Sequence, residues 1–269
     1  MLRDITLGQY YPGGSVIHRL DARTKIIATL LYIVELFVVN NFLGFIIAAA
    51  GLFAVIAVSK VPLKFIFRGL TAVFLIIAFT FVINLFMVDG RVLWQWKFLK
   101  ITEEGVSRAF FMAVRLILLI IGSSVMTLTT KPIELTDGLE KLLKPFSKIG
   151  LPSHELALMM TIALRFIPTL MEETDKIIKA QQARGADFET GNLLQRAKNL
   201  VPILIPLFVS SFRIASDLAL AMEARCYHGG DGRTRMNEIH FHRGDAVAAV
   251  LMILFLALII ASRQIGSVI

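Results

Sequence analysis

The chain has 269 residues, of which 56% are hydrophobic and 18% are charged, and its mean hydropathy is +0.72. A soluble domain of this size is usually about 45–50% apolar even when glycine is counted. The composition therefore excludes an ordinary soluble protein and indicates several membrane spans. The single cysteine, Cys226, excludes an intramolecular disulfide and a cysteine-rich metal site. The net charge is +8, but in a membrane protein the location of Lys and Arg is more informative than their sum.

Membrane-spanning helices are predicted from five segments that approach the roughly 20 mostly apolar residues a span requires. The first segment is short and interrupted by Glu35, and the fourth contains Arg108 and Arg115. The residues before the first span include charges and no apolar core, so we expect no cleaved signal peptide. The predicted spans are Ile26–Val39, Phe42–Val58, Gly69–Val88, Val106–Leu128 and Ala246–Ser262.

The stretch from Lys131 to Asp245 has a different character, because it holds 29 of the 48 charged residues. Its longest uncharged apolar runs, Leu156–Leu164 and Leu200–Phe212, are short for a span. We expect a cytoplasmic coupling domain of about three amphipathic helices; the alternative is that one or both runs dip into the bilayer. The predicted fold is thus an all-α integral membrane protein. Its parts are an N-terminal membrane domain of about four spans (1–130), the coupling domain (131–245), and a last span with an outer tail (246–269).

Lys and Arg flank the predicted spans unequally. They gather before the first span, in the loop after the second span and throughout the charged stretch, and fewer lie on the other side. Because cytoplasmic flanks collect Lys and Arg, this bias places the N-terminus and the coupling domain in the cytoplasm and the C-terminus outside. Trp94 and Trp96 are expected to anchor the outer interface.

Three amphipathic helices are expected within the charged stretch. Residues 131–149 show apolar side chains at helical spacing. A longer second helix follows, and Pro168 should kink or break it because proline removes a backbone donor and clashes with the preceding turn. A third helix is expected to start near Pro202 or Pro206.

Two similar motifs close the second and third of these helices, Ala183-Arg184-Gly185 and Ala224-Arg225-Cys226. An arginine at a helix C-terminus is ordinarily a partner for the helix dipole, worth about 0.3–1 kcal/mol. The repetition, with small neighbours that leave each guanidinium standing out, favours docking of Arg184 and Arg225 onto carboxylate-lined pockets of a partner. In the first motif, Gly185 should supply the left-handed helix cap.

Motifs spread along the chain carry a family resemblance. The segment His18-Arg19-Leu20-Asp21-Ala22-Arg23-Thr24-Lys25 is followed by Thr136-Asp137-Gly138-Leu139, by Ala163-Leu164-Arg165-Phe166-Ile167-Pro168 and by the two Ala-Arg motifs. This ordered set resembles the transmembrane T component of energy-coupling-factor (ECF) vitamin and metal transporters, over nearly the whole chain. The chain departs from the usual pattern at Ala22, where the family usually has Pro, and at Cys226, where it often has Gly.

The resemblance implies a subunit that neither hydrolyses ATP nor selects the substrate. In such proteins a membrane domain binds a small substrate-capturing S component, and crossed cytoplasmic coupling helices rest on two ATP-binding-cassette (ABC) ATPase subunits. The arginines matching Arg184 and Arg225 dock in grooves, one on each ATPase. The implied role is a non-catalytic, cofactor-free scaffold in the bacterial cell membrane, which transmits ATP-driven motion for vitamin or micronutrient uptake.

Other functions fit the residues less well. The sequence has no Gly-x-x-x-x-Gly-Lys-Ser/Thr phosphate loop for ATP and no His-Glu-x-x-His motif of a zinc enzyme. A conventional ABC permease that lines its own substrate path is the alternative, but one docking loop per chain is expected there and two motifs occur here. Near-equal acidic and basic content in the charged stretch argues against nucleic-acid binding.

Two further groups of residues are noted. Glu35 and Arg115 are ionisable residues inside predicted spans, where charges are costly and usually paired. They are a candidate ion pair, although we favour Glu35 reaching the outer interface. We interpret His240-Phe241-His242 as an ordinary cytoplasmic loop and not a metal site, because two histidines without nearby cysteine or a carboxylate cluster are a weak signal.

Overall fold

The computed structural model describes residues 9–96, 99–149, 152–186, 188, 192–229 and 241–265. These residues are mostly helical, and they form two compact units. One unit comprises Gly8–Lys141 together with Ile239–Ile269, and the other contains Leu142–Glu238. The predicted all-α membrane fold is confirmed, with one small β-hairpin in addition.

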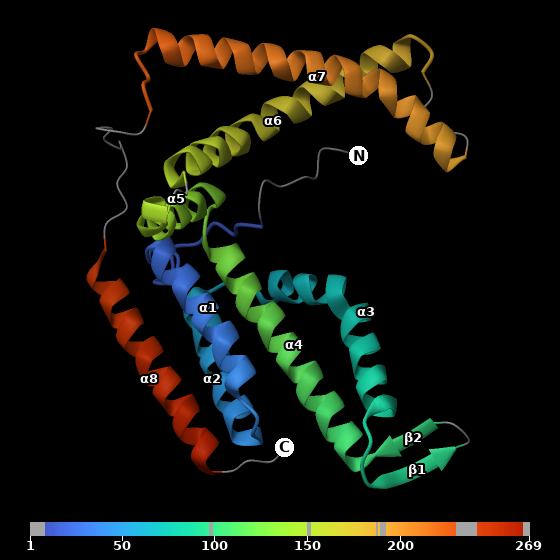
Figure 1. Ribbon diagram of the computed structural model, residues 1–269, viewed down its shortest axis with the longest axis vertical. Helices are drawn as coiled ribbons and strands as arrows, with labels where there is room; N and C mark the ends of the chain where they lie inside the picture. The colour runs from blue at the N-terminus through green and yellow to red at the C-terminus, as the bar shows by residue number, and fades with distance from the viewer. Residues whose placement is uncertain are drawn as a thin grey trace. The chain divides into compact units, whose positions relative to one another are not determined.

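The first unit contains the helices that the sequence assigns to the membrane (Figure 1). Helix α1 packs against α4 and α8, α2 packs against the same two helices, and α3 packs along α4. Leu36 of α1, Leu52 of α2, Leu118 of α4 and Ile259 of α8 are buried in one apolar cluster that forms the core. The elements of this unit are α1 (Ala22–Val38), α2 (Phe42–Ser59), α3 (Leu63–Met87), β1 (Val92–Trp96), β2 (Leu99–Thr102), α4 (Glu103–Thr129), α5 (Pro132–Leu143) and α8 (Arg243–Ile265).

Helices α2 and α8 run antiparallel and approach closely at one end. Asn41 caps α2 by accepting a hydrogen bond from the Gly44 N–H through Oδ1 (3.1 Å), and its Nδ2 donates to the Ser262 carbonyl of α8. Further along, a Cβ atom on Gly51 would lie 2.6 Å from the Phe255 ring, so α8 packs directly on the α2 backbone there. Small residues thus set the distance between these two helices.

Five described helical segments are long and apolar enough to cross a membrane, and the bent α3 would make a sixth. They are not the same five that the sequence indicates. Helix α1 has only 17 residues, and α3 bends by 58° between Thr71 and Val73. Helices α6 and α7 qualify because the apolar stripe of a long amphipathic helix contributes as many apolar residues as a short span. The five segments are Phe42–Ser59, Glu103–Thr129, Ser153–Ala183, Lys198–Ala224 and Arg243–Ser262.

The second unit consists of a 3₁₀ turn and two long crossing helices, η1 (Lys144–Ile149), α6 (Ser153–Ala183) and α7 (Leu193–Ala224). The predicted start of the third amphipathic helix near Pro202 or Pro206 is wrong, because α7 begins at Leu193 and contains both prolines. Pro168 lies inside α6 without ending it, so of the two predicted outcomes the break does not occur and the kink stays a prediction. An α-helix tolerates an internal proline where other contacts compensate the lost backbone bond, and one such contact lies at the crossing described below.

A β-hairpin that the sequence analysis did not anticipate joins α3 to α4. Strands β1 and β2 pair antiparallel, with Val92 opposite Thr102. Thr102 then caps α4, since its Oγ1 accepts a hydrogen bond from the Gly105 N–H (3.0 Å) and donates one to the Val88 carbonyl (2.7 Å). The side chains of Trp94 and Trp96, predicted as interface anchors, lie outside the described part of the structure.

Candidate functional site

The first arginine motif ends α6 in a hydrogen-bonded cap. Gly185 has a φ of +86°, and its N–H donates to the Gln182 carbonyl (2.9 Å), while the Ala186 N–H donates to the Gln181 carbonyl (3.0 Å). These two bonds define a Schellman cap, with Gly185 in the left-handed position. The predicted glycine cap is confirmed, and Arg184 occupies the cap residue itself.

The second motif ends α7 in the same backbone geometry although it lacks glycine. Cys226 has a φ of +56°, its N–H donates to the Glu223 carbonyl (2.9 Å), and the Tyr227 N–H donates to the Met222 carbonyl (3.0 Å). A residue with a Cβ atom adopts this conformation at a cost of about 1–2 kcal/mol. The exchange of Gly for Cys therefore leaves the cap intact, and Arg225 holds the position equivalent to Arg184.

Both arginines are open to a partner. Arg184 and Arg225 are exposed, and so are Ala183 and Ala224 before them. Neither guanidinium makes a hydrogen bond or ion pair with any residue that the structure describes. Each planar group therefore offers five N–H donors in a fixed fork from the end of a rigid helix, which suits bidentate binding of a carboxylate.

The crossing of α6 and α7 lies close to the first motif. Gln181 Nε2 donates to the Pro202 carbonyl of α7 (3.2 Å), and Ser210 Oγ lies 3.4 Å from Glu173 Oε1 of α6. In an uninterrupted helix the Pro202 carbonyl would accept the N–H of the residue four positions later, which here is Pro206 and has none. The Gln181 side chain thus satisfies the carbonyl that the proline leaves without its helical partner.

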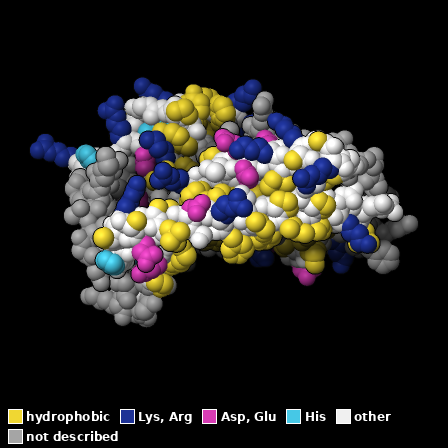
Figure 2. Space-filling view, turned by 90° about the horizontal axis from the view of Figure 1, so that it is seen from above, with side chains coloured by type: hydrophobic (Ala, Val, Ile, Leu, Met, Phe, Trp, Pro, Cys, Tyr) yellow, Lys and Arg dark blue, Asp and Glu magenta, His cyan; other side chains and the backbone are white. Residues whose placement is uncertain are grey.

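The two motifs lie far apart, at opposite ends of the crossed pair (Figure 1). Arg184 is three residues beyond Gln181, whereas Arg225 lies 23 residues beyond Pro202, a distance of roughly 35 Å along α7 at 1.5 Å per residue. Figure 2, viewed from the side of α7, shows basic and acidic side chains interspersed with apolar ones on this face. The two arginines are therefore too far apart for a single partner pocket to hold both.

The N-terminal motif of the family resemblance forms a junction in the first unit. Arg23 Nη2 lies 2.8 Å from Asp21 Oδ2, and its guanidinium lies 3.8 Å from the centre of the Phe241 ring. The Asp21 N–H donates to Asp245 Oδ1 at the start of α8 (2.8 Å). Burial alone would raise the pKa of Asp21, but hydrogen bonds from the Arg23 side chain and backbone outweigh it and hold that pKa below its ordinary value.

The same motif meets α4 and α5. Lys25 is buried, and its Nζ donates to the His18 carbonyl (3.1 Å) and to the Thr129 carbonyl at the end of α4 (2.9 Å). Gly138, in the motif Thr136-Asp137-Gly138-Leu139, lies so close to α1 that a Cβ atom there would be 2.9 Å from the Ala22 Cβ. Two motifs more than 100 residues apart thus pack together and fix the meeting point of α1, α4 and α5.

Neither interpretation offered for Glu35 agrees with the structure. Arg115 Nη2 donates instead to the Val39 carbonyl (2.8 Å), with its guanidinium above the Phe37 and Phe45 rings. Among the described residues no ion pair joins Arg115 to Glu35. Glu35 does not reach the outer interface either, because only 2% of its surface is exposed. The Val39 carbonyl just after α1 thus accepts one N–H of the guanidinium, while Arg115 Nε is buried without a hydrogen-bond partner among the described residues.

The histidine loop is only partly described. His240 lies outside the described residues, and the His242 N–H donates to Asp245 Oδ2 (2.8 Å), an N-terminal cap of α8. No group of three or more possible metal ligands occurs within the described ranges.

Comparison with known proteins places the chain in a family. A family model described as CbiQ, cobalt transport protein, matches residues 13–236. The chain is 60% identical over 265 residues to a Clostridium kluyveri protein named energy-coupling factor transporter transmembrane protein EcfT, covering 98% of each chain. Proteins of the same name from Thermosediminibacter oceani and Bacillus subtilis are 57% identical over 249 residues and 45% identical over 264 residues. The alignment with the Thermosediminibacter oceani protein covers 93% of this chain and 94% of that protein. The alignment with the Bacillus subtilis protein covers 98% of this chain and 100% of that protein.

The helical membrane fold and these matches define the class of protein as a multi-pass subunit of a membrane transporter. More particularly, the chain belongs to the family of energy-coupling factor transporter transmembrane proteins.

Proposed function

We propose that the chain couples two ABC ATPase subunits to a membrane-embedded S component, and that Arg184 and Arg225 each anchor one ATPase. The observation that carries this proposal is the repetition of one structure: an exposed arginine at the cap of a long helix, followed by a left-handed residue in a Schellman cap. The chain itself supplies no catalytic group and binds no cofactor. The S component captures the substrate, a vitamin or another micronutrient.

Charge and geometry support the anchoring role. A guanidinium at a helix C-terminus is already favoured by the helix dipole, and its fork matches a carboxylate in a groove. The separation of about 35 Å along α7 gives each ATPase its own arginine. The flanking residues differ, Gly185 at one site and Cys226 at the other, so the two contacts are similar but not identical.

The proposed topology follows from the basic residues. The N-terminus and the α6–α7 unit lie in the cytoplasm, where the ATPases are, and the C-terminus lies outside. ATP-driven closure of the ATPases moves the two anchored helices, and this motion reorients the S component in the membrane to release its substrate inside the cell.

Co-purification of the ATPases with Arg184→Ala, Arg225→Ala and the double variant tests the anchors. Removing one partner of a buried charge pair costs about 2–5 kcal/mol, which is a loss of about 30-fold to several thousand-fold in affinity at 1.4 kcal/mol per factor of ten. Each single variant should weaken assembly, and the double variant should abolish it. Arg184→Lys should restore little, because an ammonium lacks the planar fork.

Lys179→Ala on α6 and Arg213→Ala on α7 are matched controls, since each removes an exposed cation from the same helix at a position other than its capping residue. The controls should assemble and support substrate uptake at the level of the unchanged chain. Normal assembly and uptake by the double variant would show that the arginines are dipole partners only.

A further inference from the structure

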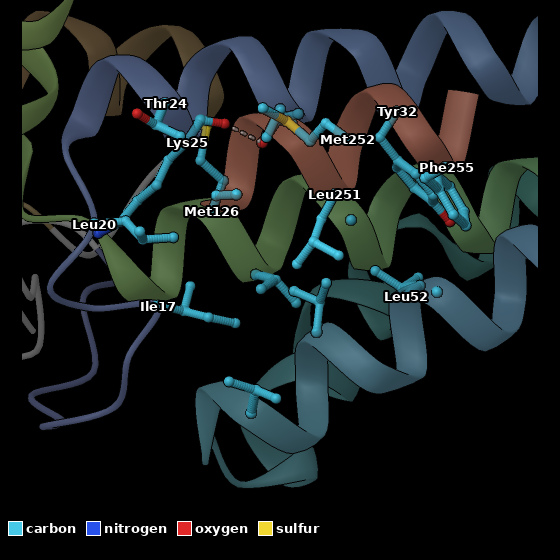
Figure 3. A pocket seen from close by; sticks show the side chains of 18 of the residues that line it. Ile17, Leu20, Thr24, Lys25, Tyr32, Leu52, Met126, Leu251, Met252 and Phe255 are labelled. Carbon is cyan, nitrogen blue, oxygen red and sulfur yellow. Dashed lines mark hydrogen bonds between the residues drawn. The ribbon is translucent and has the colours of Figure 1, made fainter. Parts of the chain in front are cut away.

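A cavity of about 530 Å³ lies inside the first unit, between α1, α2, α4 and α8 (Figure 3). One stripe of α1 lines it from Lys25 to Glu35, which is roughly 15 Å at 1.5 Å per residue. Most of the wall is aliphatic or aromatic, and Figure 3 shows Tyr32, Leu52 and Phe255 near one end, with Lys25 and Thr24 toward the other. The cavity is thus long and apolar, with a basic group near one end.

The cavity opens sideways between α2 and α8. The two helices touch at Asn41 and Ser262 and again at Gly51 and Phe255. Val55 and Val58 of α2 and Val247 and Leu251 of α8 line the cavity and remain 43–60% exposed. In a membrane subunit, an apolar opening between two helices faces hydrocarbon and not water.

The basic end has an unused donor. An ammonium group carries three N–H donors, and two of those on Lys25 reach the His18 and Thr129 carbonyls. Within the described residues the third has no acceptor, and Lys25 lines the cavity. The carboxylates of Asp21, Glu134 and Asp245 already act on the charge of Lys25, so an anionic oxygen at this end would serve by satisfying the remaining donor.

We propose that this cavity binds one acyl chain of an anionic membrane phospholipid, which enters between α2 and α8 with its phosphate end beside Lys25. The volume lies within the range of small-molecule sites, about 300–1,000 Å³. The nearly uninterrupted apolar wall suits a hydrocarbon chain, and the basic group near one end suits a phosphate. The length of roughly 15 Å between Lys25 and Glu35 along α1 accommodates a single extended hydrocarbon chain.

Glu35 lines the end of the cavity opposite Lys25. It is the one acidic residue among the described residues that line the cavity, and no described residue forms a hydrogen bond or ion pair with its side chain. A carboxyl group beside a hydrocarbon chain disfavours binding. The acyl-chain proposal therefore predicts that Glu35→Leu retains more lipid than the unchanged chain. An occupant that pairs with the carboxylate through a polar group gives the opposite result.

The experiment uses the full-length chain, reconstituted in vesicles of equal parts phosphatidylglycerol and phosphatidylcholine and then extracted in mild detergent. Native mass spectrometry counts the retained lipids. Ala248→Phe places a ring in the cavity, whereas Ala246→Phe places the same ring on an exposed position of α8 that does not line it. A phosphatidylglycerol with a photoreactive acyl chain maps the contact on the unchanged chain and requires no substitution.

The expected result is one retained phosphatidylglycerol in preference to phosphatidylcholine, its loss in Ala248→Phe, its retention in Ala246→Phe and cross-links at Val55 and Leu251. Equal retention of the two lipids overturns the role of Lys25. Cross-links spread evenly over exposed apolar residues, or lower retention in Glu35→Leu, overturn the cavity as an acyl-chain site. These readouts need no ATPase, so they are independent of the arginine anchors.

Discussion

Gly185→Ala and Cys226→Gly should shift the stability of the two helix ends in opposite directions. Both positions have a positive φ, where a Cβ atom costs about 1–2 kcal/mol. No atom lies within 4 Å of a Cβ built on Gly185, so the cost there comes from the backbone alone. Part is offset, because alanine loses less chain entropy than glycine on folding, by about 0.4–1 kcal/mol. The net change is about 0.7 kcal/mol, destabilising for Gly185→Ala and stabilising for Cys226→Gly.

Hydrogen exchange of the capping amides measures this directly. At 1.4 kcal/mol per factor of ten, 0.7 kcal/mol is about a threefold change in protection. The amide of Ala186 should exchange about threefold faster in Gly185→Ala, and that of Tyr227 about threefold slower in Cys226→Gly. Cys226→Ala is the matched control, since it removes the thiol but keeps the Cβ atom and should leave protection unchanged. Equal protection in Cys226→Ala and Cys226→Gly would refute the argument from backbone strain.

Two further predictions concern the contacts that hold each unit together. Gln181→Leu leaves the Pro202 carbonyl without a hydrogen-bond donor and should lower the free energy of unfolding of the α6–α7 unit by about 1 kcal/mol, measured by hydrogen exchange of α7. Gln181→Glu also removes the N–H donor, so the α7 amides should lose a similar amount of protection from hydrogen exchange in the Glu and Leu variants. Unchanged protection of α7 in either variant would contradict the role of Gln181. Asp21→Asn loses a charge-assisted bond from Arg23 and should destabilise the first unit by about 1.5–3 kcal/mol at neutral pH. Because the pKa of Asp21 is lowered in the folded chain, its contribution is present above the ordinary pKa of 3.8 and disappears as the pH falls through the folded value. Thermal unfolding in detergent should show a constant difference from pH 7 down to near the ordinary pKa of 3.8 and a shrinking difference below it. A difference that stays constant as the pH falls further would contradict the assignment.

The sequence was sufficient for the features that depend on local chemistry. Apolar run lengths indicated α2, α4 and α8, and the Ala-Arg motifs indicated where α6 and α7 end. The prediction for the start of α7 is wrong because proline is typical of the first turn of a helix, whereas Pro202 and Pro206 lie inside α7. The compensating contact comes from Gln181 in another helix, and that pairing is not visible in the sequence near the prolines. The spacing of four residues between Pro202 and Pro206 is the signal that would have indicated this contact. Such a spacing leaves a helical carbonyl without its N–H donor, and a side chain of another helix can then bind it.

Long-range partners explain the remaining differences. Arg115 was considered together with Glu35 because both are charged, but a backbone carbonyl at the end of α1 takes the guanidinium. Similarly, the chain order gives no hint that Gly138 packs against Ala22 or that Asp245 accepts the Asp21 N–H. Motif recognition found Asp21, Ala22 and Gly138 without a physical reason for them, and the structure supplies one: together with Asp245 they build the junction of α1, α4, α5 and α8.

The position of the α6–α7 crossing bears on how motion at the two proposed anchors is combined. Arg184 lies one helical turn from Gln181, so displacement of that anchor reaches α7 at Pro202 almost directly. Displacement of Arg225 would reach the crossing through the segment from Leu207 to Ala224. This segment contains no proline or glycine, so no kink is expected within it. Both prolines of α7 lie at or next to the crossing, where Gln181 already holds the Pro202 carbonyl. The prolines thus favour bending of α7 at the point where the two helices meet, and under the proposed anchoring the movements of two separate ATPases would converge there.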